Sequence, residues 1–156
     1  MFLQKLKINN FRNYESVQLE LEPAINVFYG ENAQGKTNLM EAVSVITLGR
    51  SFRTNREESF IRRGQNSFYL KGEFQGDTER LIIEIGTDRE RSLVRMNGVE
   101  YKKRREVFGR VKVVIFSPDD LYLIKGGPEY RREYLDLYIG QIYPTYRKIF
   151  QRYYRA

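Results

Sequence analysis

The chain has 156 residues, which is long enough for one domain with a hydrophobic core. Cysteine and histidine are both absent, so disulfide scaffolds, Cys/His zinc sites, cysteine nucleophiles and a Ser-His-Asp triad are excluded. The net charge of +7 favours binding to polyanions such as nucleic acid, with solubility alone as the alternative explanation.

The N-terminal part of the sequence is predicted to form three strands. Apolar residues recur over positions 3–11, and they alternate with polar residues over positions 17–22, which indicates a half-buried strand that ends before Pro23. The apolar run at residues 25–29 predicts a short buried strand. The N-terminus lacks the form of a signal peptide, and no run is apolar and long enough to span a membrane, so we expect a cytoplasmic protein.

Residues 30–37, which follow the apolar run at residues 25–29, match the phosphate-binding motif G-x-x-x-x-G-K-[ST] at every fixed position. A helical pattern over residues 38–48, closed by Gly49, follows the motif, and an ordinary Gly-containing turn is the alternative. In such a loop the backbone N–H groups cradle phosphates, Lys36 reaches the β- and γ-phosphates, and Thr37 ligates Mg²⁺. We therefore expect a nucleoside triphosphate to bind at Gly30, Glu31, Asn32, Ala33, Gln34, Gly35, Lys36, Thr37 and Asn38.

The middle of the chain is predicted to form an antiparallel meander. Strand patterns cover residues 68–74, 81–85 and 93–96, and the dipeptide Asn97-Gly98 indicates a hairpin turn. Residues 102–108 have the pattern of a short helix. The order of elements indicates an α/β fold, with a mixed sheet around the phosphate-loop helix, then the meander, then helices.

The C-terminal part is predicted to begin with a strand at residues 111–116 and to continue as helices. Ser117-Pro118-Asp119-Asp120 is typical of a helix start, because serine caps, proline suits the first turn and acids favour the positive helix end. Pro128 and Pro144 open two further helical patterns. The last pattern reaches Ala156 without a C-cap signal, so we expect the natural polypeptide to continue.

A P-loop hydrolase also needs an acidic residue directly after an apolar strand, where it holds the metal's water shell or activates water. The nearest candidates are Asp119 and Asp120, but Ser117 and Pro118 separate them from the strand. We interpret both acids first as N-terminal helix residues, and we assign no catalytic residue.

Several motifs in this order resemble the N-terminal part of the RecF family, bacterial recombination mediators related to SMC-type and ABC-type ATPases. The phosphate loop is common to many NTPases, whereas the blocks around it are more specific. The likeness runs almost from end to end and rests on Leu6 to Tyr14, Gly30 to Leu39, Arg50 to Arg53, Phe116 to Leu121, and Lys125 to Pro128 followed by Arg131-Arg132.

The resemblance implies an ABC-type ATPase head that binds ATP and Mg²⁺ and dimerises on DNA with ATP. It also implies a role in DNA replication, repair, recombination and the SOS response, with recombinase loading at gaps and with RecR and RecO as partners. Residues 1–116 correspond to the head lobe, and residues 117–156 to the start of a helical lobe. The family's Walker B and signature motifs lie further along, so we expect a fragment that binds ATP without hydrolysing it alone.

The same resemblance assigns roles to four residues outside the loop. Arg12 and Asn13 match the family block that approaches the nucleotide, and solvated side chains in a turn are the alternative. Arg50 and Arg53 match a further family block, and we expect them to approach phosphates or DNA, with solvated side chains again as the alternative.

The densest basic run is Lys102, Lys103, Arg104 and Arg105. A run of like charges is most often a solvated face, but it also suits contact with the DNA backbone without sequence reading. We therefore name these four residues, together with Arg50 and Arg53, as candidate DNA contacts.

Two other functions stay open at the level of sequence. A small P-loop phosphotransferase resembling a nucleotide kinase is compatible with the length, but it requires a lid with catalytic arginines where this chain has a meander. A DNA-binding module that merely inherits the loop is the third possibility, and it would bind DNA independently of Lys36.

Overall fold

The computed structural model describes residues 1–54, 56–88 and 91–153. These residues belong to two compact units, Met1–Val107 and Phe108–Ala156. The lobe boundary at residue 116 expected from the sequence stays a prediction. Within the described ranges, none of the helices combines the length and the apolar character needed to cross a membrane.

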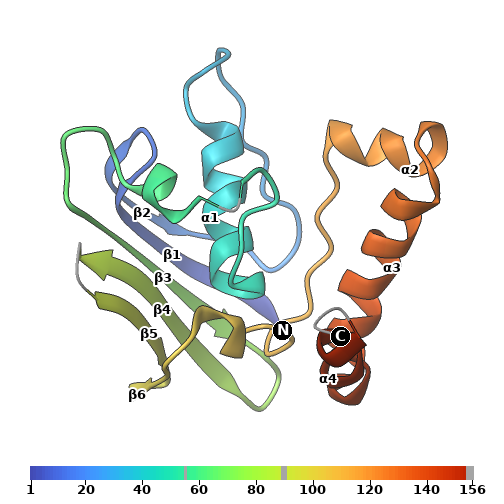
Figure 1. Cartoon of the computed structure of the whole chain (residues 1–156). Coiled ribbons are helices and arrows are strands. Elements are labelled where there is room, and N and C mark those ends of the chain that lie inside the picture. Colours follow the sequence, from blue (N-terminus) through green and yellow to red (C-terminus); the bar gives the residue numbers. More distant parts are fainter. Residues whose placement is uncertain (55, 89–90, 154–156) are drawn as a thin grey trace. The chain divides into compact units, whose positions relative to one another are not determined.

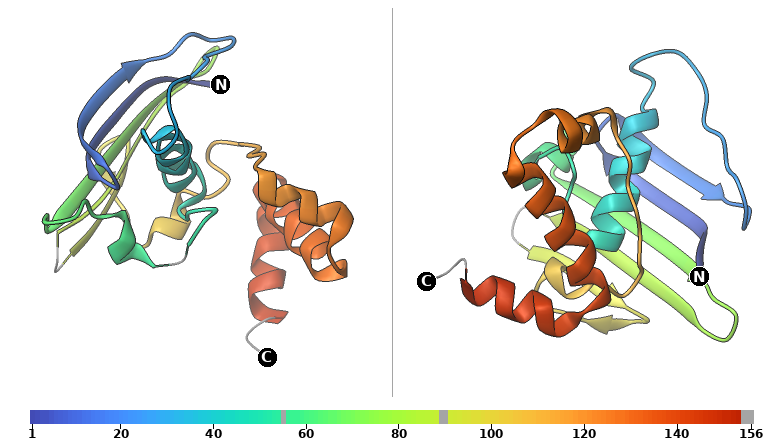
Figure 2. Two further views of the ribbon diagram at one scale, coloured as in Figure 1. Left: turned by 90° about the horizontal axis from the view of Figure 1, so that it is seen from above. Right: turned by 90° about the vertical axis from the view of Figure 1, so that its right-hand side faces the viewer.

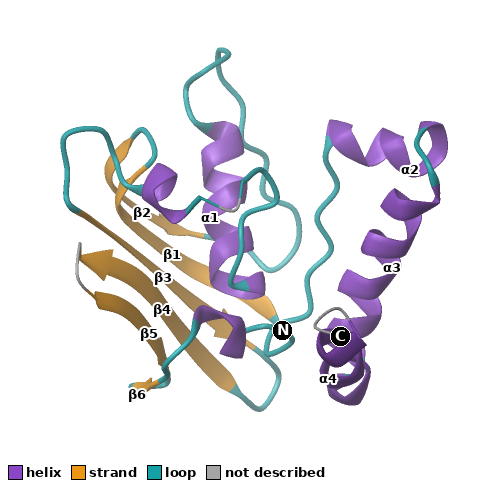
Figure 3. Ribbon diagram, viewed as in Figure 1, coloured by secondary structure: helices purple, strands orange, loops and turns teal. Residues whose placement is uncertain are grey.

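A six-stranded antiparallel sheet forms the centre of the first unit (Figures 1 and 3). The spatial order of its strands is β2-β1-β3-β4-β5-β6. The expected strands at 3–11, 17–22, 68–74, 81–85 and 93–96 are confirmed within a few residues. The observed strands are β1 (Phe2–Phe11), β2 (Tyr14–Glu20), β3 (Ser67–Gln75), β4 (Arg80–Asp88), β5 (Arg91–Met96) and β6 (Val99–Glu100).

Alternation along the strands decides which face of the sheet is buried. In β3 every second residue is buried, among them Phe68, Leu70 and Phe74, and the residues between them are partly exposed. Helix α1 (Lys36–Leu48) lies along this apolar face (Figure 2) and buries Val45 and Ile46 completely. Burying one such aliphatic side chain stabilises the fold by about 1.5–3 kcal/mol, so these contacts fix α1 on the sheet.

The hairpin prediction in this unit is confirmed, and the short-helix prediction is confirmed in part. Asn97 and Gly98 have positive φ angles of 48° and 81°, as a tight two-residue hairpin requires. The short helix predicted at residues 102–108 is the 3₁₀ turn η2 (Arg104–Glu106), and a second 3₁₀ turn, η1 (Glu57–Phe60), precedes β3.

The predicted strand at residues 25–29 is wrong for this structure. The segment forms no ladder with any described strand, and Ile25, Val27 and Tyr29 are 84%, 75% and 92% exposed. A continuous apolar run becomes a strand only when neighbours cover both faces and pair its backbone. Because this segment does not join the sheet, every strand pair in the described residues is antiparallel. The mixed sheet predicted from the sequence is therefore not observed.

In the second unit, the predicted strand at residues 111–116 is also absent from the sheet. The segment is held by side chains of a helix instead. The Gln141 amide donates to the Val113 carbonyl and accepts from the Val113 N–H, at 3.1 and 2.9 Å. The Tyr138 hydroxyl accepts from the Ile115 N–H and donates to its carbonyl, both at 3.1 Å. Two side chains one helical turn apart thus replace a neighbouring strand along one edge.

The helical predictions for the second unit are confirmed. Asp119 and Asp120 lie in the first helical turn after Ser117, whose N–H donates to the Asp120 carboxylate. Pro128 and Pro144 each begin a helix. The observed helical elements are η3 (Pro118–Leu121), α2 (Tyr122–Lys125), α3 (Pro128–Ile142) and α4 (Pro144–Tyr153).

Candidate nucleotide-binding site

The predicted phosphate loop is an exposed turn that leads into α1. Gly30, Ala33 and Gly35 have positive φ angles of 147°, 67° and 113°. Residues with positive φ angles in a loop turn backbone N–H groups toward a common concave side, which is the arrangement that binds anions. All the predicted loop residues, from Gly30 to Thr37, lie in this turn and in the first turn of α1.

The N-terminus of α1 is open to an anion. Gly35 is the N-cap residue, so no side chain caps the helix, and no acidic residue lies in its first turn. The first intrahelical bond runs from the Leu39 N–H to the Gly35 carbonyl at 2.9 Å. The preceding N–H groups therefore have no intrahelical acceptor, and together with the helix dipole they favour a negative group.

The two side chains expected to meet phosphate and metal lie at this same place. The Lys36 ammonium donates to the carbonyl oxygens of Gly30 and Glu31 at 2.7 and 2.6 Å, so it connects the end of the loop with its beginning. Thr37 is exposed in the first helical turn. A hydroxyl so placed has the donor chemistry that a Mg²⁺ ion beside a triphosphate requires.

The turn between β1 and β2 brings further side chains to the loop. The Asn13 amide donates to the Gln34 carbonyl at 3.1 Å, and its oxygen accepts from the Asn38 amide at 2.9 Å. Tyr14, which sequence reasoning missed, donates from its hydroxyl to the Gly35 carbonyl at 3.2 Å. Among the predicted nucleotide-binding residues, Asn13 and Asn38 therefore meet at the loop.

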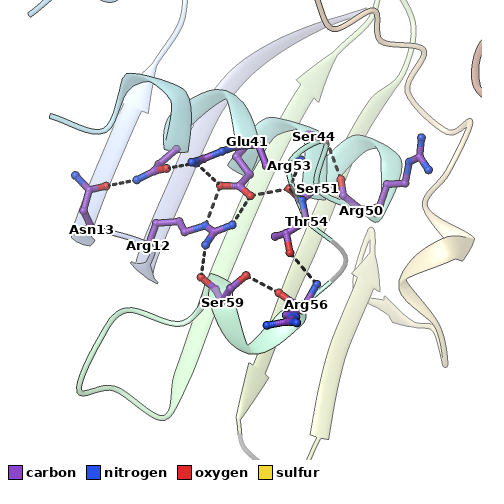
Figure 4. Close-up of polar contacts among 11 residues, drawn as sticks. Arg12, Asn13, Glu41, Ser44, Arg50, Ser51, Arg53, Thr54, Arg56 and Ser59 are labelled. Atoms are coloured by element: carbon purple, nitrogen blue, oxygen red, sulfur yellow. Dashed lines mark hydrogen bonds and ion pairs between the residues drawn. The ribbon is translucent and has the colours of Figure 1, made fainter. Parts of the chain in front are cut away.

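The Arg12 side chain reaches Glu41 in the middle of α1 (Figure 4). Its Nε and Nη2 atoms donate to the two carboxylate oxygens of Glu41 at 2.8 and 2.6 Å, and its Nη1 atom donates to the Ser59 carbonyl at 2.7 Å. Its backbone has a φ angle of 56°, an uncommon conformation for arginine. The structure thus uses Arg12 as an ion-pair partner, and a direct contact with nucleotide stays a prediction.

Glu41 is a second residue at this site that sequence reasoning missed. Its side chain is fully buried, and it also accepts hydrogen bonds from the Ser51 hydroxyl at 2.6 Å and from Arg53 at 3.3 Å. Burial opposes ionisation, but the bonds from Arg12 and Ser51 and the nearby positive charges outweigh it and lower the pKa of Glu41. The signal in the sequence is a carboxylate four residues before Val45, on the apolar side of the helix.

Of the arginines predicted to contact phosphates or DNA, Arg53 lies beside the phosphate-loop helix. Its Nη1 atom donates to the Asn38 oxygen at 2.8 Å as well as to Glu41. The Arg50 side chain is exposed, and its backbone carbonyl accepts from the Ser44 hydroxyl at 2.8 Å. Arg50 therefore lies at the C-terminal end of α1 and Arg53 beside its N-terminal half, and contact of either with phosphate or DNA stays a prediction.

The basic run at residues 102–105 does not present one continuous basic surface. Lys102, Lys103 and Arg105 are exposed, whereas Arg104 is only 9% exposed. Its guanidinium pairs with Glu57 and lies 5.6 Å from the centre of the Phe60 ring, and burial lowers the pKa of Arg104. In this conformation Arg104 is part of the core and the other three residues are accessible.

A family model described as an AAA domain matches residues 5–136. The chain therefore belongs to this AAA domain family. A solved structure of the SMC head domain from Thermotoga maritima shares the fold, with a TM-score of 0.53 and 17% identity over 69% of this chain and 41% of that one. The predicted class, a P-loop ATPase head, is confirmed.

Within this class the chain matches the N-terminal part of RecF. It is 40% identical over 146 residues to the DNA replication and repair protein RecF of Bacillus thuringiensis (strain Al Hakam), which is 94% of this chain and 39% of that relative. A structure of the recombination mediator protein RecF with ATP aligns at a TM-score of 0.88 and 35% identity, over 99% of this chain and 43% of that chain. The chain thus spans about two fifths of these relatives.

Proposed function

We propose that this chain binds ATP with Mg²⁺ through residues 30–38, as the ATP-binding part of a RecF-type DNA replication and repair protein. The observation that carries the proposal is a loop with three positive-φ residues at an uncapped helix N-terminus, with the Lys36 ammonium bonded to the first carbonyls of that loop. The relative solved with ATP supports the choice of nucleotide.

Each residue of the site has a distinct part in the proposed binding. Backbone N–H groups of the loop and the Lys36 ammonium bind the phosphates, and the Thr37 hydroxyl holds Mg²⁺. Mg²⁺ would neutralise phosphate charge there. Asn13 and Asn38 line the loop from the adjoining turn and helix. Arg12 acts on the same site through its pairing with Glu41.

The wider role that we propose is that of a recombination mediator. With ATP the longer protein dimerises on DNA at single-strand gaps and supports recombinase loading together with RecR and RecO. Five exposed basic residues supply backbone contacts to DNA, namely Arg50, Arg53, Lys102, Lys103 and Arg105. We do not expect hydrolysis from these 156 residues alone, and location in the cytoplasm stays a prediction.

The meander favours this function over that of a phosphotransferase. A nucleotide kinase needs a lid with arginines over the acceptor, whereas the sequence after α1 continues into the paired strands β3, β4 and β5. The family match points the same way.

Calorimetric titration of the chain with Mg²⁺–ATP tests the proposal. Lys36→Ala should weaken binding by at least about 100-fold, equivalent to about 2.7 kcal/mol, without lowering the melting temperature. Lys7→Ala removes the same charge from an exposed site on β1, between the buried residues Leu6 and Ile8, and should bind as the wild type does. Absence of binding by the wild type, or equal binding by Lys36→Ala, would refute the proposed nucleotide site.

A further inference from the structure

Glu41 is the only buried carboxylate in the part of the chain that the structure describes. A charge removed from water is costly unless it is paired and hydrogen-bonded. Glu41 is paired with two guanidinium groups, those of Arg12 and Arg53, and also accepts a hydrogen bond from the Ser51 hydroxyl. An apolar residue would fill this position of α1 at a lower free-energy cost. Packing alone therefore does not explain why a charged residue occupies it.

One arm of contacts from Glu41 runs through the β1–β2 turn. Arg12 binds the carboxylate in a bidentate manner while its backbone adopts a φ angle of 56°. A left-handed arginine persists only where surrounding contacts hold it. The next residue, Asn13, donates to the Gln34 carbonyl of the phosphate loop, so fixing Arg12 also fixes the side chain that touches the loop.

The second arm runs along the surface of α1. The Nη1 atom of Arg53 contacts both Glu41 and the Asn38 oxygen, at 3.3 and 2.8 Å. The Asn38 amide in turn donates to the Asn13 oxygen at 2.9 Å. Both arms therefore end at Asn13, whose amide nitrogen lies 2.7 Å from the point where a Cβ on Gly35 would stand.

We propose that Glu41 is a positioning residue of the nucleotide site: through Arg12 and Arg53 it holds Asn13 and Asn38 against the phosphate loop and so preorganises the loop for a triphosphate. The inference rests on the proposed ATP site and deepens it. Glu41 itself touches no ligand. It raises affinity because a loop already held in its binding conformation loses less freedom when the nucleotide arrives.

A double-mutant cycle on ATP affinity separates this role from general stabilisation. Glu41→Gln should weaken Mg²⁺–ATP binding about 10-fold and Asn13→Ala about 5-fold. The double variant should also bind about 10-fold more weakly, because both changes interrupt the same contacts. Multiplicative losses of about 50-fold, or unchanged affinity in a folded Glu41→Gln variant, would overturn the proposal. Glu84→Gln, which alters a carboxylate on the sheet bonded to Tyr69, is the matched control and should bind normally.

A measurement without nucleotide keeps this inference distinct from the proposed function. In ¹⁵N-labelled protein, Glu41→Gln should shift the side-chain amide signals of Asn13 and Asn38 and the backbone amide of Gly35, whereas Glu84→Gln should not. Unshifted signals would overturn the positioning role even if ATP binds. Should Glu41→Gln fail to fold, Arg53→Ala takes its place in both experiments, because the Arg53 side chain is 44% exposed. The same non-multiplicative loss with Asn13→Ala is then expected.

Discussion

The two ends of helix α1 are built from the same element, a glycine in the left-handed region, and serve different purposes. At the N-terminus Gly35 leaves the helix without a side-chain cap and next to an exposed loop. At the C-terminus the Gly49 N–H donates to the Val45 carbonyl at 3.0 Å, and the Ser44 hydroxyl donates to the Arg50 carbonyl at 2.8 Å. At the C-terminal end these groups are hydrogen-bonded within the fold, and at the N-terminal end the first N–H groups of the helix stay available to a ligand.

The surroundings of the two glycines show what each end requires. A Cβ on Gly49 would stand 2.5 Å from the carbonyl oxygen of Arg104, which is backbone and cannot move away easily. A Cβ on Gly35 would meet the side chain of Asn13 at 2.7 Å, and a side chain can turn aside. The C-terminal end is therefore constrained by packing, and the N-terminal end by the contacts that shape the ligand site.

The largest expected effect is that of Gly49→Ala. A positive φ angle of 69° and the clash with the Arg104 backbone should together lower the free energy of unfolding by about 3 kcal/mol. Urea denaturation of the purified variant measures this. A loss below about 1 kcal/mol would mean that the C-terminal end is not constrained by packing.

Gly35→Ala should act mainly on the ligand. Its strained φ angle of 113° and the displaced Asn13 should reduce ATP affinity about 30-fold, equivalent to about 2 kcal/mol, and cost about 1 kcal/mol of stability. Titration and urea denaturation of the same sample give both numbers. If stability fell as far as in Gly49→Ala while affinity held, the contrast between the two ends would be lost.

Gly98→Ala supplies the reference for backbone strain without crowding. Gly98 has a φ angle of 81°, and a Cβ added to it would have open space around it. We expect a loss of about 1 kcal/mol and unchanged ATP affinity. The difference between this variant and Gly49→Ala then measures the clash with Arg104 alone, and equal losses would show that the clash is relieved at no cost.

The smallest expected effect is a loss of stability at low pH that arises from Glu41. Because the pKa of Glu41 is lower in the folded chain than its ordinary value of about 4.3, the unfolded chain binds the proton first as the pH falls. The stabilisation from Glu41 is present above that value and is lost below it, toward the lowered pKa. Stability measured from about pH 6 to about pH 3 should fall more steeply in the wild type than in Glu41→Gln, and parallel curves would contradict the assigned direction.

Local sequence patterns determined most of the elements and the position of the candidate site. Apolar patterns predicted β1 to β5, and the alternation in β2 corresponds to a face that is only partly buried. Asn97-Gly98 predicted the hairpin because asparagine and glycine tolerate positive φ angles. The loop at residues 30–37 was predictable because its function depends on glycines, a lysine and a hydroxyl at fixed spacing.

Tertiary structure alone decided which charged and apolar groups are paired. Apolarity at residues 25–29 and 111–116 does not specify a partner, and a strand exists only where another backbone supplies its hydrogen bonds. Likewise, Arg12 and Glu41 are 29 residues apart and Arg104 and Glu57 are even further apart, so these ion pairs and the burial of Glu41 and Arg104 arise from long-range packing. The sequence by itself determines the phosphate loop, and the folded chain determines what holds that loop in place.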